Sequence, residues 1–186
     1  LYISNIAYMS LGQGGGTNLS GNRDNYEENG QYNFQDAFNF NRNNINPLYN
    51  SSEKASDTYL YSSINNHYWY GALSTANYQI NKLFTMSGGI DLRYYKGEHY
   101  REVVNLLGGD YYVHHYAKAG ETGTERMRGV GGLIDYHNTG YHDWYGGWSQ
   151  LEYAADAFSV VASGARSVSR YQRQEQYNET EGDEFS

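Results

Sequence analysis

The strongest constraint on this chain is the alternation of residue types over residues 83–96, which read LFTMSGGIDLRYYK. Every second residue of a β-strand points to the same side, whereas a helix groups residues three and four positions apart. Apolar or small residues fill one alternate set, which is Phe84, Met86, Gly88, Ile90, Leu92 and Tyr94. The other set is Thr85, Ser87, Gly89, Asp91, Arg93 and Tyr95. Helical spacing would mix these sets, so the pattern predicts a two-faced strand.

The preceding segment, residues 66–80, repeats the plan and adds a second observation. Tyr occurs near both ends of one face, with small or apolar residues between. This layout is typical of two aromatic girdles around a lipid-facing band. Both segments also exceed the usual strand of about 5–6 residues and match the ~9–11 that a tilted strand needs to cross hydrocarbon. Only Asn81 and Lys82 separate them, which predicts a hairpin.

A second hairpin is predicted from residues 144–153 and 157–171, joined by a turn at Ala155 and Asp156. Phe158 lies on the face that we expect to be apolar, while serines occupy most of the opposite face. Arg166 and Arg170 share the side of Phe158, and we expect them above the lipid band, where acidic headgroups would neutralise them. Residues 1–12 are expected to form a further strand, although apolar and polar residues are poorly separated between its two faces.

The connections favour a barrel over a soluble sandwich. Both hairpin turns are short, but the links at the other end cover residues 13–65 and 97–143. Loops beyond about 12–15 residues are uncommon in compact domains, and outer-membrane barrels combine periplasmic turns with long extracellular loops. The first link carries enough apolar residues to pack over a barrel mouth, with a helical turn expected at residues 35–40.

Composition agrees with an all-β chain and excludes several functions. The sequence holds 22 Tyr and 22 Gly but one Pro and no Cys, so it has no disulfide, thiolate metal site or thiol nucleophile. A net charge of −8 with scattered basic residues argues against nucleic acid. The mean hydropathy of −0.82 does not argue against a barrel, because lumen-facing residues offset lipid-facing ones. The start at Leu1 without a signal peptide fits a mature or truncated protein.

Two strings resemble a known family. Residues 64–112, INNHYWYGALSTANYQINKLFTMSGGIDLRYYKGEHYREVVNLLGGDYY, are similar to the barrel of TonB-dependent receptors from Bacteroidetes-type bacteria. Residues 144–173, WYGGWSQLEYAADAFSVVASGARSVSRYQR, resemble the downstream hairpin of that family. The resemblance implies a transmembrane barrel of roughly 22 antiparallel strands, of which residues 1–186 supply several, around a plug domain that this chain does not contain.

The resemblance also implies a function and partners. The parent protein would lie in the cell outer membrane and import a scarce nutrient, such as an iron chelate, cobalamin, glycan or peptide. Its partners would be outer-membrane lipids, the nutrient, the TonB complex through the absent plug, and in some systems a surface lipoprotein. The alternatives that stay open are a secreted or surface β-sandwich that binds glycans, a passive porin and a surface adhesin.

Chemical motifs are sparse. No nucleophile elbow, phosphate loop or HExxH motif occurs, and we expect neither an enzyme nor a cofactor. His114 and His115 are adjacent and would point to opposite faces of a strand, so no metal site is predicted. The ligand-binding candidates are Asp110, Tyr111 and Tyr112. The two tyrosine rings could stack on a ligand, or they could instead form part of the upper aromatic girdle or pack the loop base. Asp91 and Arg93 are expected to form a structural ion pair.

Overall fold

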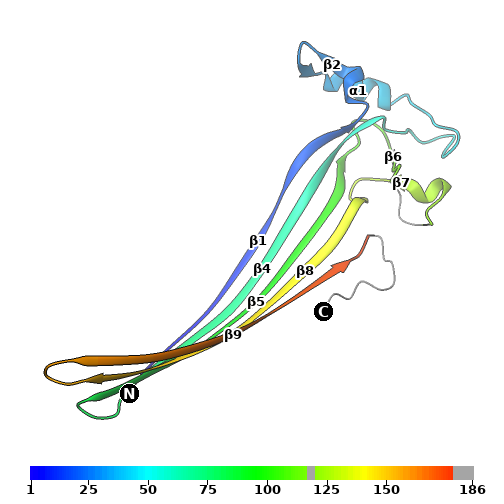
Figure 1. The fold of residues 1–186 in the computed structure, drawn as a ribbon. Coiled ribbons are helices and arrows are strands. Elements are labelled where there is room, and N and C mark those ends of the chain that lie inside the picture. Colours follow the sequence, from blue (N-terminus) through cyan, green and yellow to red (C-terminus); the bar gives the residue numbers. More distant parts are fainter. Residues whose placement is uncertain (117–119, 178–186) are drawn as a thin grey trace.

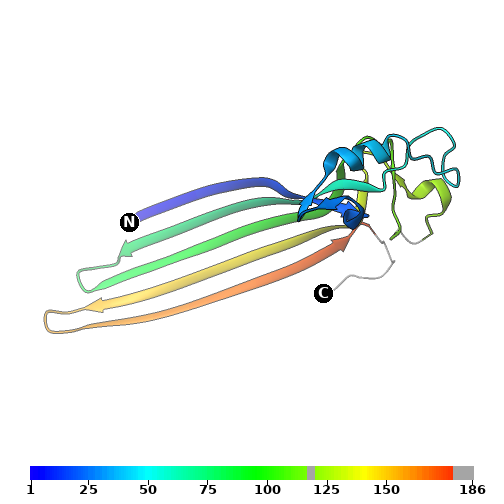
Figure 2. The ribbon, with the colours of Figure 1, turned by 90° about the horizontal axis from the view of Figure 1, so that it is seen from above.

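A computed structural model describes residues 1–116 and 120–177 as an all-β chain with 66% strand. Five long antiparallel strands form one sheet that is not closed, in the order β1-β4-β5-β8-β9. Figures 1 and 2 show this sheet as a long, curved ribbon. The strands are β1 (Tyr2–Gly21), β4 (Thr58–Gln79), β5 (Phe84–Asn105), β8 (Leu133–Ala154) and β9 (Ser159–Glu175).

The connections differ at the two ends of the sheet. Short turns at residues 80–83 and 155–158 join β4 to β5 and β8 to β9, which confirms both predicted hairpins. The longer connections, residues 22–57 and 106–132, gather at the opposite end (Figure 1). No helix among the described residues is long and apolar enough to cross a membrane.

Short elements give the two long connections their shape. Helix α1 (Phe34–Asn41) confirms the helical turn predicted at residues 35–40. The side-chain oxygen of Asn33 caps it by accepting a hydrogen bond from the backbone N–H of Asp36 at 3.1 Å. The first connection contains η1 (Arg23–Tyr26), β2 (Glu27–Glu28), β3 (Gln31–Tyr32) and α1 (Phe34–Asn41). The second contains β6 (Tyr112–Val113), η2 (Gly123–Arg126) and β7 (Met127–Arg128).

The predicted loop boundaries were wrong at the end where the long connections lie. β1 extends to Gly21 and includes the glycine run at residues 12–16, which pairs with residues 63–67 of β4. β4, β5 and β8 likewise begin or end beyond the predicted limits. The reason is that strand pairing uses backbone groups, so a ladder continues through glycine-rich or polar stretches whose side chains carry no alternation.

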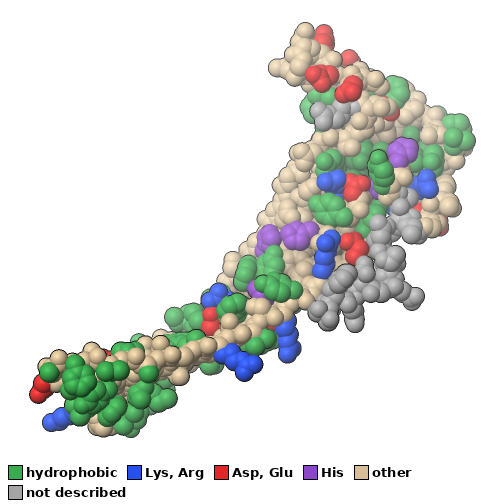
Figure 3. Space-filling view, viewed as in Figure 1, with side chains coloured by type: hydrophobic (Ala, Val, Ile, Leu, Met, Phe, Trp, Pro, Cys, Tyr) green, Lys and Arg blue, Asp and Glu red, His purple; other side chains and the backbone are tan. Residues whose placement is uncertain are grey.

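The register places residues of like character side by side and gives the sheet two different faces. The apolar face carries alternate residues of all five strands, including Ile3, Ala7, Met9, Tyr70, Ala72, Ala76, Tyr78, Phe84, Met86, Ile90, Leu92, Tyr94, Tyr145, Leu151, Tyr153, Val160, Ala162 and Val168. The other face is mainly polar and carries Ser4, Ser10, His67, Trp69, Thr75, Ser87, Asp91, Arg93, Tyr95, His99, Trp144, His142, Gln150, Ser163, Ser167 and Tyr171, together with the apolar residues Ile6, Leu73, Trp148 and Val161. We call it the polar face. In Figure 3 hydrophobic side chains gather toward the turn end of the sheet.

The expectation that Arg166 lies above the lipid band stays a prediction, but the structure gives its row along the strand. Arg166 pairs with Gly147, which in turn pairs with Ile90, so it lies on a row within the apolar face. Arg170 lies further toward the long connections and pairs with Asp143, level with Tyr94. Alternation identifies the face of a residue, but its position along the face depends on pairing with other strands.

Buried side chains concentrate where the two long connections meet the sheet. One cluster holds Tyr59, Val103, Leu106 and Ile134, and a second holds Ala55, Tyr111 and Val113. Asn41, which is fully buried, joins the connections by donating from Nδ2 to the carbonyls of Thr58, Leu106 and Leu107 at 2.8 to 3.1 Å. The loops are therefore a packed layer with their own small cores.

Candidate functional site

The three residues predicted to contact a ligand lie at the base of the loop layer. The carboxylate of Asp110 accepts a hydrogen bond from the backbone N–H of Lys54 at 2.8 Å. This bond links the second connection to the first. Tyr111 is 3% exposed and packs with Ala55 and Val113. Asp110 and Tyr111 therefore stabilise the contact between the two connections.

Tyr112 lies against the sheet itself. Its ring packs on Tyr59 with centroids 3.9 Å apart, and burial raises the pKa of its hydroxyl. Tyr59 is on the polar face of β4, so this contact places the second connection over that face. All three predicted residues are thus found in loop packing, which was one of the alternative roles considered for the two tyrosines.

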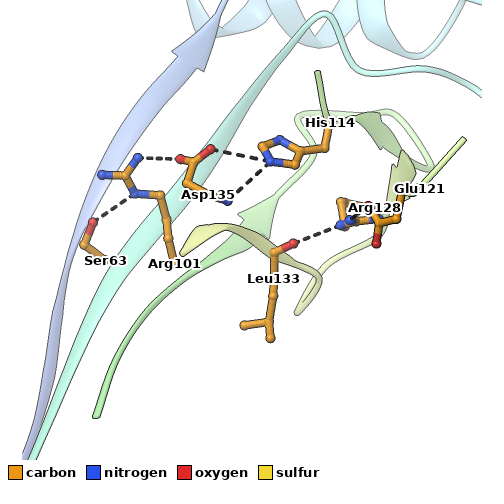
Figure 4. A network of polar contacts seen from close by, with 7 residues as sticks. All are labelled: Ser63, Arg101, His114, Glu121, Arg128, Leu133 and Asp135. Atoms are coloured by element: carbon orange, nitrogen blue, oxygen red, sulfur yellow. Dashed lines mark hydrogen bonds and ion pairs between the residues drawn. The ribbon is translucent and has the colours of Figure 1, made fainter. Parts of the chain in front are cut away.

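A polar network fixes the same connection to the polar face (Figure 4). Arg101 donates from Nη1 to Asp135 at 2.5 Å and from Nε to the Ser63 hydroxyl at 3.3 Å. Asp135 in turn donates its backbone N–H to Nε2 of His114 at 3.3 Å. His114 is 1% exposed, and burial lowers the pKa of its imidazole despite the opposing effect of Asp135.

A bulge in β8 aims Asp135 at this network. Arg101 of β5 pairs with Ile134, while its neighbour Tyr100 pairs with His137, so two residues of β8 are left over. Asp135 is one of them and has a φ of 61°, a left-handed conformation that is unusual outside glycine. Bulges of this kind redirect side chains, and here the carboxylate gains both Arg101 and His114 as partners.

Arg128 forms a second set of contacts within the second long connection. Its guanidinium forms an ion pair with Glu121 and donates to the carbonyls of Leu133 at 2.9 Å and Glu125 at 2.5 Å. Burial opposes its charge, but the hydrogen bond to Glu121 raises the pKa of Arg128. A buried arginine with these partners makes the connection a fixed cover over one end of the polar face.

Between this cover and the turn end, the polar face contains a hollow of about 460 Å³. Its floor is at Gly140 of β8, where an added Cβ would meet no atom within 4 Å. Side chains of β5 and β9 rise on either side, and other β8 residues close the hollow along the strand. The residues that line it are Trp69, Tyr95, His99, Asn138, Gly140, Tyr141, His142, Tyr171, Gln172 and Arg173.

A row of four rings crosses the sheet at the turn-side end of the hollow. Trp69, Tyr95, His142 and Tyr171 are register partners on β4, β5, β8 and β9. The rings associate in pairs, with Trp69 and Tyr95 centroids 4.6 Å apart and the rings of His142 and Tyr171 stacked at 4.1 Å. Gly97 makes room for Tyr95, whose hydroxyl would be 2.3 Å from a Cβ at Gly97.

Hydrogen-bonding groups line the loop-side end. His99 and Asn138 are register partners on β5 and β8, and Arg173 of β9 pairs with Gly140. The Nδ1 atom of His99 lies 2.5 Å from the side-chain oxygen of Asn65. That oxygen only accepts, so Nδ1 carries the proton and Nε2 is the acceptor of the neutral ring. Nε2 would also be 3.1 Å from a Cβ at Gly97, so it lies near the floor of the hollow.

Sequence reasoning did not identify this hollow, although it identified the strands that form it. The signal was the recurrence of Trp, Tyr and His at alternate positions of residues 67–71, 95–99 and 142–144, which became a site only through cross-strand register. The predicted ion pair of Asp91 and Arg93 is confirmed, with contacts of 2.5 and 2.9 Å. Within residues 1–116 and 120–177, no group of three or more His, Asp or Glu side chains is placed to hold a metal ion.

Comparisons of this chain with known protein families, with curated proteins and with solved structures find no match.

Proposed function

We propose that this sheet is part of the wall of an outer-membrane β-barrel that takes up a nutrient in the manner of TonB-dependent receptors. The observation that carries the proposal is the division of the sheet into a mainly apolar and a mainly polar face, which is clearest in β4, β5 and β8. Lipid would contact the apolar face, and the polar face would line the lumen. Further strands would pair with β1 and β9 to close the barrel.

The exposed apolar face supports a membrane environment. Met9, Ile90 and Val160 lie on three different strands of this face and are each more than half exposed. An apolar surface of this extent is rare on soluble monomers. The rival β-sandwich would cover such a face with a second sheet, and the described residues contain, beyond the five-stranded sheet, only two ribbons of two strands each.

The two ends of the sheet differ in a way that supports a periplasmic and an extracellular side. Tight turns at one end and long packed connections at the other match the periplasmic and extracellular sides of such barrels. The second connection folds over the polar face, as a loop that narrows a barrel mouth would. Strands of about 20 residues also exceed the ~9–11 needed to cross hydrocarbon, so their loop-side halves would stand above the membrane.

Uptake, rather than simple membrane insertion, is supported by the sequence resemblance and by the hollow. The hollow lies on the polar face, on the loop side of the aromatic residues Tyr94 and Tyr145 of the apolar face. A ligand captured from outside would meet it before reaching the depth of the membrane.

Fractionation of cells that express the full-length protein tests the barrel. We expect the protein in the outer-membrane fraction, extractable only with detergent, with a gel mobility that changes on boiling. A folded protein that stays soluble without detergent would instead favour the secreted sandwich. Conductance in planar bilayers tests the porin alternative, because a plugged receptor should stay closed whereas a passive porin should show open steps.

A further inference from the structure

The hollow at Gly140 combines two chemistries that are complementary to one class of ligand. The turn-side end offers aromatic rings, and the loop-side end offers an imidazole acceptor at His99, an amide at Asn138 and a guanidinium at Arg173. Its volume of about 460 Å³ lies in the ~300–1,000 Å³ range of small-ligand pockets. A matching ligand has a flat apolar face for the rings and a rim of neutral polar groups.

Charge separates the possible ligands. The one formally charged side chain among the lining residues is Arg173, and it lies 3.5 Å from the carboxylate of Glu175. The chain as a whole carries a net charge of −8. An anionic chelate would therefore gain little electrostatic attraction here. The binding of a neutral ligand does not depend on such attraction.

The ring geometry also suits a ring-shaped ligand. His142 and Tyr171 stack face to face, so they form a rigid pair on one side of the floor, and Tyr95 stands on the other side over Gly97. The open Cβ position at Gly140 lets a ligand approach the backbone between them. A pyranose ring presents C–H groups to such rings, while its hydroxyls reach the polar end.

We propose that the hollow at Gly140 is a binding subsite for a neutral saccharide, which places one pyranose ring between Tyr95 and the stacked pair of His142 and Tyr171 and donates a hydroxyl to Nε2 of His99. The proposal rests on the proposed function, since it names the class of nutrient that the barrel captures. It places the subsite on the lumenal wall, below the cover formed by residues 106–116 and 120–132.

Two glycines provide a matched pair of variants. Gly140→Val fills the hollow, and the added Cβ meets nothing within 4 Å, so the strand should fold as well as before or better. Gly164→Val is the control, because an added Cβ there also meets nothing within 4 Å but would lie on the apolar face. Tyr171→Ala removes one ring without filling the space.

The experiment measures glycan binding by the full-length protein, purified in detergent, on an array of neutral hexose and N-acetylhexosamine oligosaccharides. Uronic acid oligosaccharides, ferric catecholate, cobalamin and short peptides serve as competing ligands in solution. We expect the wild type and Gly164→Val to bind a neutral glycan equally. Affinity should fall about tenfold or more in Gly140→Val and Tyr171→Ala, and a tenfold fall corresponds to ~1.4 kcal/mol.

Three results would overturn the subsite: no neutral glycan binds, a glycan binds equally to Gly140→Val and wild type, or one of the other ligands binds in a manner that Gly140→Val abolishes. The change of gel mobility on boiling, measured on the same samples, tests the barrel separately. A soluble protein that binds glycans at Gly140 would support the subsite and contradict the barrel. A detergent-dependent barrel without glycan binding would support the barrel and contradict the subsite.

Discussion

Asn41 shows how much of the loop layer depends on single side chains. It is fully buried, donates to three carbonyls and accepts the Asp57 N–H at 2.9 Å. It follows the hydrophobic residues of α1, and nothing in its local sequence distinguishes it from the other asparagines nearby. Its role arises because the two connections meet there.

Replacement of Asn41 tests this role. Asn41→Leu keeps the approximate size but leaves buried carbonyls without a donor, which costs about 1–3 kcal/mol for each unsatisfied group. We expect residues 22–57 and 106–132 to become sensitive to protease at concentrations that leave the wild type intact. Asn39→Ala, at an exposed position of the same helix, should behave like the wild type. Equal resistance of both variants would contradict the assignment.

His114 predicts a pH dependence of the second connection. Its pKa is lowered in the folded state, chiefly by burial, so the open state binds more protons at mildly acidic pH. The contribution of His114 to the stability of the folded connection is then complete above the unfolded pKa near 6.5. It is lost as the pH falls below 6.5 toward the lowered pKa of the folded state. The negative charges of Asp135 and Glu121 reduce this lowering of the His114 pKa, and the positive charge of Arg128 increases it.

Proteolysis at two pH values measures this dependence. Cleavage within residues 106–132 should be faster at a pH of about 5.5 than at about 7.5 in the wild type. His114→Gln should lose most of that difference, while His115→Gln, at an exposed position, should retain it. A wild type with the same cleavage rate at both pH values would show that His114 does not titrate on opening.

The apolar face of the strands allows a direct test of the membrane proposal. Ile90 is 52% exposed on the apolar face of β5, with Gly147 beside it on β8. Arg at this position should lower the free energy of unfolding by about 2–4 kcal/mol if the site lies near the bilayer midplane. Urea titration in lipid vesicles measures the change.

Ser167→Arg is the matched control for Ile90→Arg. Ser167 lies on the polar face of β9, next in the chain to Arg166, which is on the row of Ile90. A charged side chain there would enter the water-filled lumen, so little change in stability is expected. Equal losses in both variants would mean that the two faces do not meet different solvents.

Arg166 gives the reverse prediction. It lies on a row of the apolar face, so in the proposed barrel its guanidinium would have to extend along the strand to reach polar surroundings. Arg166→Leu should therefore raise the stability in vesicles, by up to ~2–4 kcal/mol if the site is at the midplane. Arg170→Leu, which lies opposite Asp143 and nearer the loops, should gain less. A loss of stability in Arg166→Leu would place this row outside the lipid.

The whole molecule has two different ends, and the absence of cysteine makes them easy to probe. Ser51→Cys lies in the first long connection and Asp156→Cys in the turn between β8 and β9. In intact cells a membrane-impermeant maleimide should label Ser51→Cys, and it should label Asp156→Cys only after the outer membrane is broken. Labelling of both in intact cells would contradict a sheet that spans the membrane.

Local alternation was sufficient to find two hairpins and assign their faces, because the direction of a side chain on a strand follows from its own position in the chain. The strand ends were mistaken, because glycines at residues 12–16 and polar residues beyond Lys96 pair through backbone groups that alternation does not reveal.

The all-β character and the two-faced strands of this protein were thus readable from the chain, since both depend on near neighbours. The loop layer, the bulge at Asp135 and the hollow at Gly140 were not readable, because each unites residues that are distant in the sequence. A shift of one residue in the pairing of β5 with β8 would turn His142 away from Tyr95 and leave every local pattern unchanged.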